Sequence, residues 1–388
     1  MNTTIETGLP WRAMLFTIGI SAWLSTLSVR AETDGSLLAE LSVEQAVKTA
    51  VRDNPSLAEV QSRYEAMALV PSQVGTLPDP IVTAGAMNLP TDTFDRSQEP
   101  MTQLQLGFSQ AFPFPGKLSL KAEAAEHDAV AARHSVDEAR LQLIRKVKHQ
   151  WWQIYYVDRA IETVARNQAL LTQFIEVAKT KYETGKGLQQ DVLLAQLELS
   201  KLIDQDIQLQ AIARRQRIQL NVLMDQAPER PIRLPEQVAK QLPNLASESQ
   251  LYDQAETARP LLKSLATRID AAQSRLALAR RDRYPDFTVG VTYGDRTGTN
   301  PLPRGGDRSD FLSLMVGIKM PLYARRKQHK AIAQREVDLQ TSRYALLDER
   351  GLVRGAIASS ATDYRRSQQQ LSLFETGIVP QAQQTVQS

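Results

Sequence analysis

Three observations predict a mainly α-helical protein with a small β part, built from long antiparallel coiled-coil hairpins and four β-strands. First, residues 118–183 contain neither proline nor glycine and carry a heptad pattern of small apolar residues. Second, four short segments alternate apolar and polar side chains, which is the period of a strand. Third, the order of these patterns in the first half recurs in the second, which indicates an internal duplication.

The first element is predicted to be a helix that begins near residue 42. Ser42 stands three residues before Gln45, which is the spacing of a capping box, and a helical pattern follows. We expect this helix to run through Asn54-Pro55 and to end between Pro71 and Pro80.

The segment after residue 117 is predicted to be one unbroken helix, about 100 Å long at about 1.5 Å per residue. Its apolar residues recur at alternating spacings of four and three, which is a coiled-coil seam. The seam residues are Leu118, Ala122, Ala125, Ala129, Ala132, Val136, Ala139 and Leu143.

A turn and a returning helix follow this segment. The predicted turn depends on Gly185 and Gly187, because glycine tolerates the positive φ angles that a chain reversal needs. The returning helix continues the seam with Val192, Ala195, Leu199 and Leu202. A proline-rich link over residues 228–243 ends the first half.

The predicted strands form two pairs, separated by polar loops over residues 90–100 and 295–310. The alternating apolar residues are Leu104, Leu106 and Phe108, then Phe287, Val289, Val291 and Tyr293, then Leu312, Leu314, Val316 and Ile318. Each strand is expected to have about nine to eleven residues, enough to cross a bilayer when tilted. One face is apolar and the other small or polar, which suits lipid on one side and a wet lumen on the other.

Four strands cannot close a transmembrane barrel, which needs at least about eight. If the strands lie in a membrane, several chains must therefore share one barrel, and three copies would supply twelve strands. The same features occur in soluble proteins, since alternating strands form any antiparallel sheet and Ala-rich heptads form ordinary coiled coils.

The halves repeat each other in detail. Arg259-Pro260 parallels Asn54-Pro55, and Tyr284-Pro285-Asp286 parallels Leu77-Pro78-Asp79. We expect a first structural repeat over residues 32–243 and a second over residues 244–388. The second repeat has no counterpart of the first repeat's returning helix.

The first 31 residues are predicted to be a secretory signal peptide. Arg12 precedes an apolar run over residues 13–24, and Val29-Arg30-Ala31 fits the small-residue rule for signal peptidase. The run is too short for a membrane anchor. The chain has no cysteine, so neither a disulfide nor a lipid-bearing cysteine is expected.

Composition and motifs argue against two classes of function. The 46 basic and 43 acidic residues are scattered along the chain, without the basic stripe of a nucleic-acid binder. No nucleophile–base pair, phosphate-binding glycine loop or pair of acids with an obvious pocket is visible. We therefore expect no enzyme activity, no cofactor and no nucleic-acid partner.

In combination, these patterns resemble the TolC family of outer-membrane efflux proteins over nearly the whole chain. The resemblance depends on the repeated strand pairs, on the Asn54-Pro55 helix, and on Gly185 followed by Asp191-Val192. It also depends on the opening run Leu41-Ser42-Val43-Glu44-Gln45-Ala46. Two further motifs, Leu77-Pro78-Asp79-Pro80 and Phe112-Pro113-Phe114-Pro115-Gly116-Lys117, look most like the heavy-metal branch of CusC and CzcC.

The resemblance implies a homotrimer with one shared barrel in the outer membrane and a helical tunnel in the periplasm. It also implies docking to a periplasmic adaptor bound to an inner-membrane pump, so that the chain is a passive duct that exports substrates, with metal cations as one option. The main alternative is a secreted periplasmic coiled-coil adaptor or scaffold without a channel. A periplasmic enzyme is a third.

The candidate site is the turn between the two long helices. The resemblance implies adaptor contact at Thr184, Gly185, Lys186 and Gly187, although the family's Val-Gly-Leu tripeptide is here Thr-Gly-Lys. Asp191 is interpreted as a cap of the returning helix or as a residue of the tunnel entrance, and capping is preferred because the helix dipole favours an acid there.

Other residues that could bind ligands are interpreted as structural. His127 and His134 are two helical turns apart, too far to share one ion easily. Met87, Met101, Met315 and Met320 could offer soft metal ligands but are expected to pack as apolar side chains. Trp151, Trp152, Tyr155 and Tyr156 are expected to pack between neighbouring helices.

Overall fold

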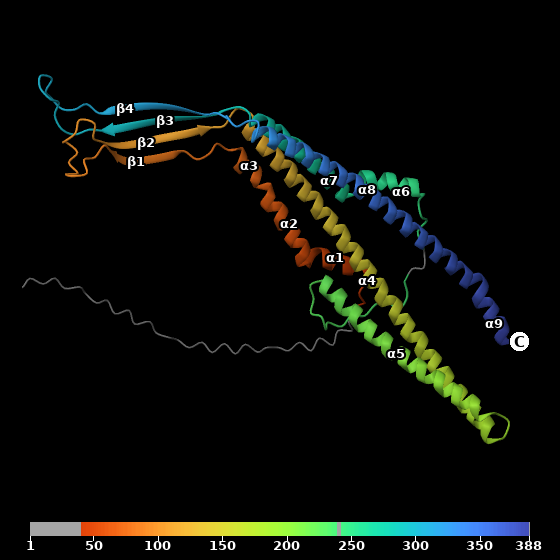
Figure 1. Cartoon of the computed structure of the whole chain (residues 1–388). Helices are drawn as coiled ribbons and strands as arrows, with labels where there is room; N and C mark the ends of the chain where they lie inside the picture. Colours follow the sequence, from red (N-terminus) through yellow and green to blue (C-terminus); the bar gives the residue numbers. More distant parts are fainter. Residues whose placement is uncertain (1–39, 239–241, 388) are drawn as a thin grey trace, which may run out of the picture. The chain divides into compact units, whose positions relative to one another are not determined.

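The computed structural model describes residues 40–238 and 242–387, and the predicted signal peptide lies outside these ranges. The described residues are mainly helical with one four-stranded sheet, as predicted (Figure 1). In this part of the chain, no helix is both long enough and apolar enough to cross a membrane.

Residues 43–75 form three helices where the sequence predicted one. They are α1 (Val43–Asp53), α2 (Pro55–Ala68) and α3 (Val70–Gly75). The break lies at Asn54, whose ψ of 118° is extended because a residue before proline avoids the helical region. The Asn54 side chain accepts from the Leu57 N–H (3.2 Å) and donates to the Leu223 carbonyl (2.9 Å), which fixes the angle between α1 and α2.

The long helical hairpin is confirmed. Helix α4 (Lys117–Glu183) has 67 residues without a break, and α5 (Gln189–Leu223) returns along it. Ala129, Val136 and Leu143 of the predicted seam are buried, and so is Ala195 on the returning helix.

The first half has a core where α1 and α2 pack on α4 and the end of α5. Trp151 is almost fully buried there, and its indole N–H donates to the Leu41 carbonyl at 2.9 Å. The buried side chains around it are Ala46, Ala50, Val147, Ile154, Leu220 and Met224. The core therefore fixes the N-terminal helices to the hairpin.

Four antiparallel strands form the sheet, in the order β1-β2-β3-β4. They are β1 (Ile81–Met87), β2 (Gln103–Phe112), β3 (Asp286–Asp295) and β4 (Phe311–Lys319). Strand β1 has 7 residues, fewer than expected, because Asn88 takes a φ of 54° and turns the chain out of the strand. The β2–β3 pair joins the two halves of the chain.

The second half resembles the first in having helices, then two strands, then a long helix. Its elements are α6 (Glu248–Ala258), α7 (Pro260–Arg281), β3, β4, α8 (Gln328–Leu373), the π-helical turn η1 (Phe374–Ile378) and α9 (Val379–Gln387). Ser247 and Gln250 form a capping box at the start of α6, like Ser42 and Gln45 at α1, and sequence inspection missed it.

Small side chains allow α7 to lie close to α4. The Ser264 hydroxyl donates to the Ala131 carbonyl of α4 at 2.9 Å and lies 3.2 Å from the Ser135 hydroxyl. Nearby, Arg259 pairs with Glu138, whose side chain is buried, at 3.1 Å. The second half is thus held to the long helix of the first by both packing and charge.

A buried lysine joins strands and helices where the two halves meet. The Lys117 side chain is 6% exposed, and its ammonium donates to the Asp286 carboxylate (2.8 Å) and the Tyr284 carbonyl (3.0 Å). Asp286 also accepts from the Phe114 N–H at 2.9 Å, and the Phe114 and Tyr284 rings stack at 4.6 Å. The start of α4 is therefore fixed to the start of β3.

We expect Lys117→Ala to destabilise this junction, because it leaves Asp286 without its cation. The expected loss in the free energy of unfolding is about 2–3 kcal/mol, the range for hydrogen bonds to charged groups. Unfolding of detergent-extracted protein by urea, followed by the helical circular dichroism signal, measures it. Lys121→Ala, an exposed position one helical turn later, should change the value by less than about 0.5 kcal/mol. Equal losses in both variants would contradict the assignment.

Candidate functional site

One face of the sheet is apolar and open. The register aligns Leu106, Tyr293 and Leu312 in one row and Phe108, Val291 and Leu314 in the next. Exposure reaches 80% at Leu314. The predicted alternation is thus confirmed, and it produces a continuous apolar surface rather than a buried core.

The opposite face carries mostly small and polar side chains, with Ile81, Met87 and Met315 exposed among them. Gly107, Thr292 and Ser313 form one of its rows, and a Cβ added at Gly107 would overlap the Thr83 hydroxyl. A Cβ at Gly294 would overlap the Gln103 side chain. At these two positions, glycine leaves room for polar side chains of the neighbouring strand to lie across this face.

The two loops at the far end of the sheet are bound to each other. The Arg308 guanidinium donates to the carbonyls of Ser97 (3.0 Å) and Glu99 (3.1 Å) in the other loop, and Arg96 pairs with Asp295. Hydrogen bonds from the Tyr293 hydroxyl and then from the Arg296 N–H lower the pKa of Asp310. The loops of the two halves thus form one connected layer.

The predicted turn between α4 and α5 lies where the sequence placed it (Figure 1). Gly185 has a φ of 71°, as predicted, and its N–H donates to the Tyr182 carbonyl at 2.9 Å. The reason given for Gly187 is wrong, because its φ is not positive. A Cβ there would instead lie 3.0 Å from the Lys181 Cβ, so this glycine allows close packing.

Asp191 is not a side-chain cap, and that interpretation is wrong. The N-cap of α5 is Leu188, with no side-chain hydrogen bond, and Asp191 lies in the first turn of the helix. A carboxylate there still interacts favourably with the helix dipole. Asp191, Lys186 and Gly187 line one open groove of about 500 Å³ between α4 and α5, together with apolar side chains such as Phe174.

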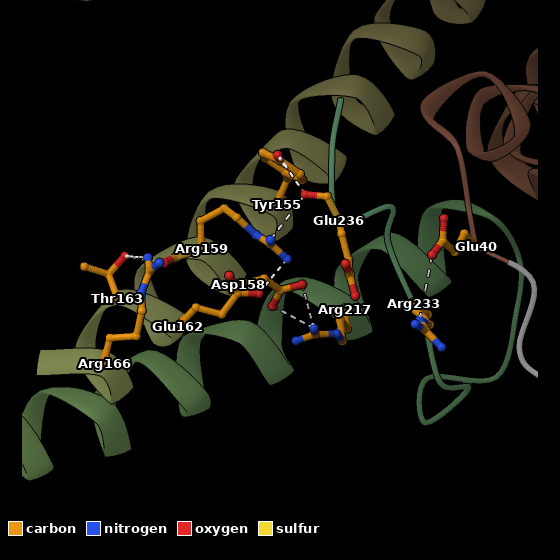
Figure 2. Close-up of polar contacts among 10 residues, drawn as sticks. All are labelled: Glu40, Tyr155, Asp158, Arg159, Glu162, Thr163, Arg166, Arg217, Arg233 and Glu236. Carbon is orange, nitrogen blue, oxygen red and sulfur yellow. Dashed lines mark hydrogen bonds and ion pairs between the residues drawn. The ribbon is translucent and has the colours of Figure 1, made fainter. Parts of the chain in front are cut away.

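A second cavity, which sequence reasoning missed, lies between the hairpin and the proline-rich link. It has a volume of about 700 Å³ and is lined by α4, α5 and residues 228–236. Figure 2 shows Arg217 of α5 bound to both oxygens of Asp158 of α4, at 2.7 and 2.9 Å. Asp158 and Arg217 lie on different helices, 59 positions apart, so the sequence gives no sign that they form an ion pair.

Arg159 connects this cavity to the link. Its guanidinium donates to the Glu236 carbonyl at 3.2 Å, pairs with Glu162 at 2.7 Å and lies 5.5 Å from the centre of the Tyr155 ring (Figure 2). The Tyr155 hydroxyl donates to the same carbonyl at 3.4 Å. Asp158, Arg159, Glu162 and Arg217 are thus paired at the hairpin side of the cavity, and Tyr155 and Arg159 hold the link through the Glu236 carbonyl.

The four aromatic residues between positions 151 and 156 of α4 divide into two groups. Trp151 and Tyr155 pack in the core, stacked at 5.8 Å, as predicted. Trp152 and Tyr156 are 45% and 68% exposed in the single chain, so helices of this chain do not cover them, and their packing between neighbouring helices stays a prediction. Adjacent helical residues point about 100° apart, and both members of such a pair cannot face one neighbour.

His127 lies 3.9 Å from Glu123 of its own helix. In the described ranges, no three His, Asp or Glu side chains come together in an arrangement that could hold a metal ion.

Comparison with known proteins now assigns the fold. The sequence profile of the family described as outer membrane efflux protein matches residues 46–225 and 251–388. The chain belongs to this family. Its members are channels and not enzymes, in agreement with the lack of catalytic motifs. No curated protein sequence matches the chain.

Solved structures agree with this membership in the outer membrane efflux protein family. The outer-membrane channel OprN is 19% identical, with 88% of this chain and 78% of that chain covered and a TM-score of 0.71. VceC from Vibrio cholerae is 20% identical, covering 88% and 83%, also with a TM-score of 0.71. CusC is 14% identical, covering 90% and 82%, with a TM-score of 0.67. At these identities the likeness establishes a shared fold, and the heavy-metal branch is not distinguished.

Proposed function

We propose that this chain is the outer-membrane channel component of a tripartite efflux system, with its helices in the periplasm. The observation that carries the proposal is the sheet with one exposed apolar face and one small, polar face. Such a sheet suits lipid on one side and a water-filled lumen on the other. Family membership supports the same function.

The edges of the sheet support a homotrimer. Strands β1 and β4 pair on one side only within the described chain. In a bilayer, each unpaired backbone group costs several kcal/mol, because no water is there to bond it. Further copies of the chain would satisfy both edges, and three copies give one shared twelve-stranded barrel within the size range of outer-membrane barrels.

The α4–α5 turn is the proposed contact with a periplasmic adaptor, which would in turn hold an inner-membrane pump. Thr184 and Lys186 are exposed, and the groove beside them is lined by apolar side chains and by charged ones such as Lys181 and Glu198. This composition suits a helical or extended segment of another protein. Asp191 lines the same groove and is proposed as part of the tunnel entrance.

The first test is the native mass of protein extracted from purified outer membranes in mild detergent. We expect a detergent-dependent trimer. A monomer or dimer in the soluble periplasmic fraction would contradict the channel and support the scaffold alternative.

Two neighbouring positions on β4, Ser313 and Leu314, lie on opposite faces of the sheet and test which face contacts lipid. Leu314→Lys places a charge on the apolar face, at an expected cost of about 2–4 kcal/mol in lipid, and should reduce the recovered trimer. Ser313→Lys adds the same charge on the polar face and should leave the trimer intact. Equal recovery of both variants would contradict the orientation of the sheet.

A single cysteine tests the adaptor contact, because the natural chain has none. We expect a thiol-reactive cross-linker on Lys186→Cys to capture the adaptor in whole cells. Lys121→Cys, exposed at the other end of α4, is the matched control and should capture none. Capture from Lys121→Cys alone would place the adaptor elsewhere.

The cargo is proposed from sequence motifs alone. The two proline-containing motifs at residues 77–80 and 112–117, which resemble those of the heavy-metal branch, favour metal cations. Deleting the gene for this chain should then make the cells more sensitive to copper, silver or zinc salts. Increased sensitivity to organic drugs without any change for the metals would overturn this assignment.

A further inference from the structure

The segment that connects β4 to α8 carries an unusual excess of positive charge. We define residues 320–330 as the basic elbow. Its cations are Arg325, Arg326, Lys327 and Lys330, and it contains no acidic residue. All four side chains are exposed, and no ion pair joins any of them to another described residue.

Further cations lie at the same end of the sheet. Asp286 pairs with Lys319 in the β3–β4 register, so the chain before β3 and the chain after β4 leave the sheet together. Exposed Arg281 and Arg283 therefore lie at the end where the basic elbow begins. Asp282 and Asp286 face the buried Lys117 at 3.5 and 2.8 Å, and Asp79, directly before β1, is a further exposed acid at this end. The exposed cations of the basic elbow, together with Arg281 and Arg283, outnumber these acids.

The opposite end of the sheet has no such excess. The loops over residues 88–102 and 296–310 together contain five acidic and four basic residues. Positive charge is therefore concentrated at the end from which the long helices continue, and a general surplus of basic residues does not account for it.

The charge is unfavourable for the helix it precedes. Lys327 is the N-cap of α8, no side chain caps this end, and the first turn contains no acid. The N-terminal end of a helix carries the positive pole of its dipole, so cations there destabilise it. A residue choice that opposes the local fold indicates that the cations have another function.

Exposed apolar side chains accompany the cations. Leu322 and Tyr323 are 78% and 77% exposed, and Met320 is exposed as well. They follow directly on the apolar face of β4. Apolar and tyrosine side chains beside basic ones are typical of the border between the hydrocarbon and headgroup regions of a membrane.

We propose that the basic elbow binds the phosphate headgroups of anionic phospholipids in the leaflet from which the helices emerge. The proposal rests on the proposed outer-membrane function. Arginine and lysine donate charge-assisted hydrogen bonds to phosphate oxygens, while Leu322 and Tyr323 enter the adjoining apolar layer. Basic segments next to a membrane-spanning element are attracted to anionic lipid in this way, over about one Debye length.

The test uses the full chain extracted from outer membranes in mild detergent, with phosphatidylglycerol or phosphatidylcholine added. Native mass spectrometry counts the lipids that stay bound. We expect the wild type to retain phosphatidylglycerol in preference to phosphatidylcholine, and added sodium chloride to reduce this retention. The variant Arg325→Gln/Arg326→Gln/Lys327→Gln should lose at least about tenfold in that preference.

A matched variant removes the same charge elsewhere. Lys146→Gln/Lys148→Gln/Arg343→Gln changes three exposed cations on α4 and α8 and should retain phosphatidylglycerol like the wild type. Unchanged retention in the elbow variant, or equal losses in both variants, would overturn the proposal. A change in oligomeric mass confined to the elbow variant would assign the segment to contact between copies and would overturn it too.

The outcome is separable from that of the proposed function. If the wild type is a trimer in the outer membrane and the elbow variant keeps its lipid, only the elbow assignment fails. If the wild type is absent from the outer membrane, the channel proposal fails, and lipid retention by the purified chain still decides whether the elbow binds anionic headgroups.

Discussion

The pairing of β2 with β3 is the interaction on which the rest of the structure depends. Each half alone contributes a two-stranded hairpin, which is marginally stable in water. Backbone hydrogen bonds from Leu104–Asp295 to Phe112–Phe287 join the hairpins into one sheet. The Lys117–Asp286 ion pair at the end of this ladder then fixes the start of the long helix α4 to the start of β3.

Side-chain size determines how the helices continue from that junction. Alanine and serine on α4 and α7 let the backbones approach until Ser264 bonds the Ala131 carbonyl across the interface. Larger apolar residues gather where three or more elements meet, as around Trp151. The described residues thus have one larger core around Trp151 and two small apolar clusters between α7 and α8, and many apolar side chains elsewhere on the helices stay exposed.

The surfaces proposed to act in function lie on different elements and differ in chemistry. The sheet presents an apolar face, and the basic elbow concentrates positive charge. The groove beside the α4–α5 turn is lined by both apolar and charged side chains. None of them resembles a catalytic site with convergent titratable groups. A channel depends on the shape and the surface composition of long elements rather than on one site of convergent groups.

The sequence by itself determined the elements whose signals are local. The absence of proline and glycine predicted the full length of α4, Gly185 predicted its turn, and strict alternation predicted which strand residues share a face. The tertiary structure decided what depends on contacts between distant residues. The partner of Lys117 lies 169 positions away, the cavity at Asp158 needs a residue of α5, and Trp152 differs from Trp151 only in the direction it faces. Periodicity fixes the face of an element on which a side chain lies, whereas only the packed fold determines what covers that face.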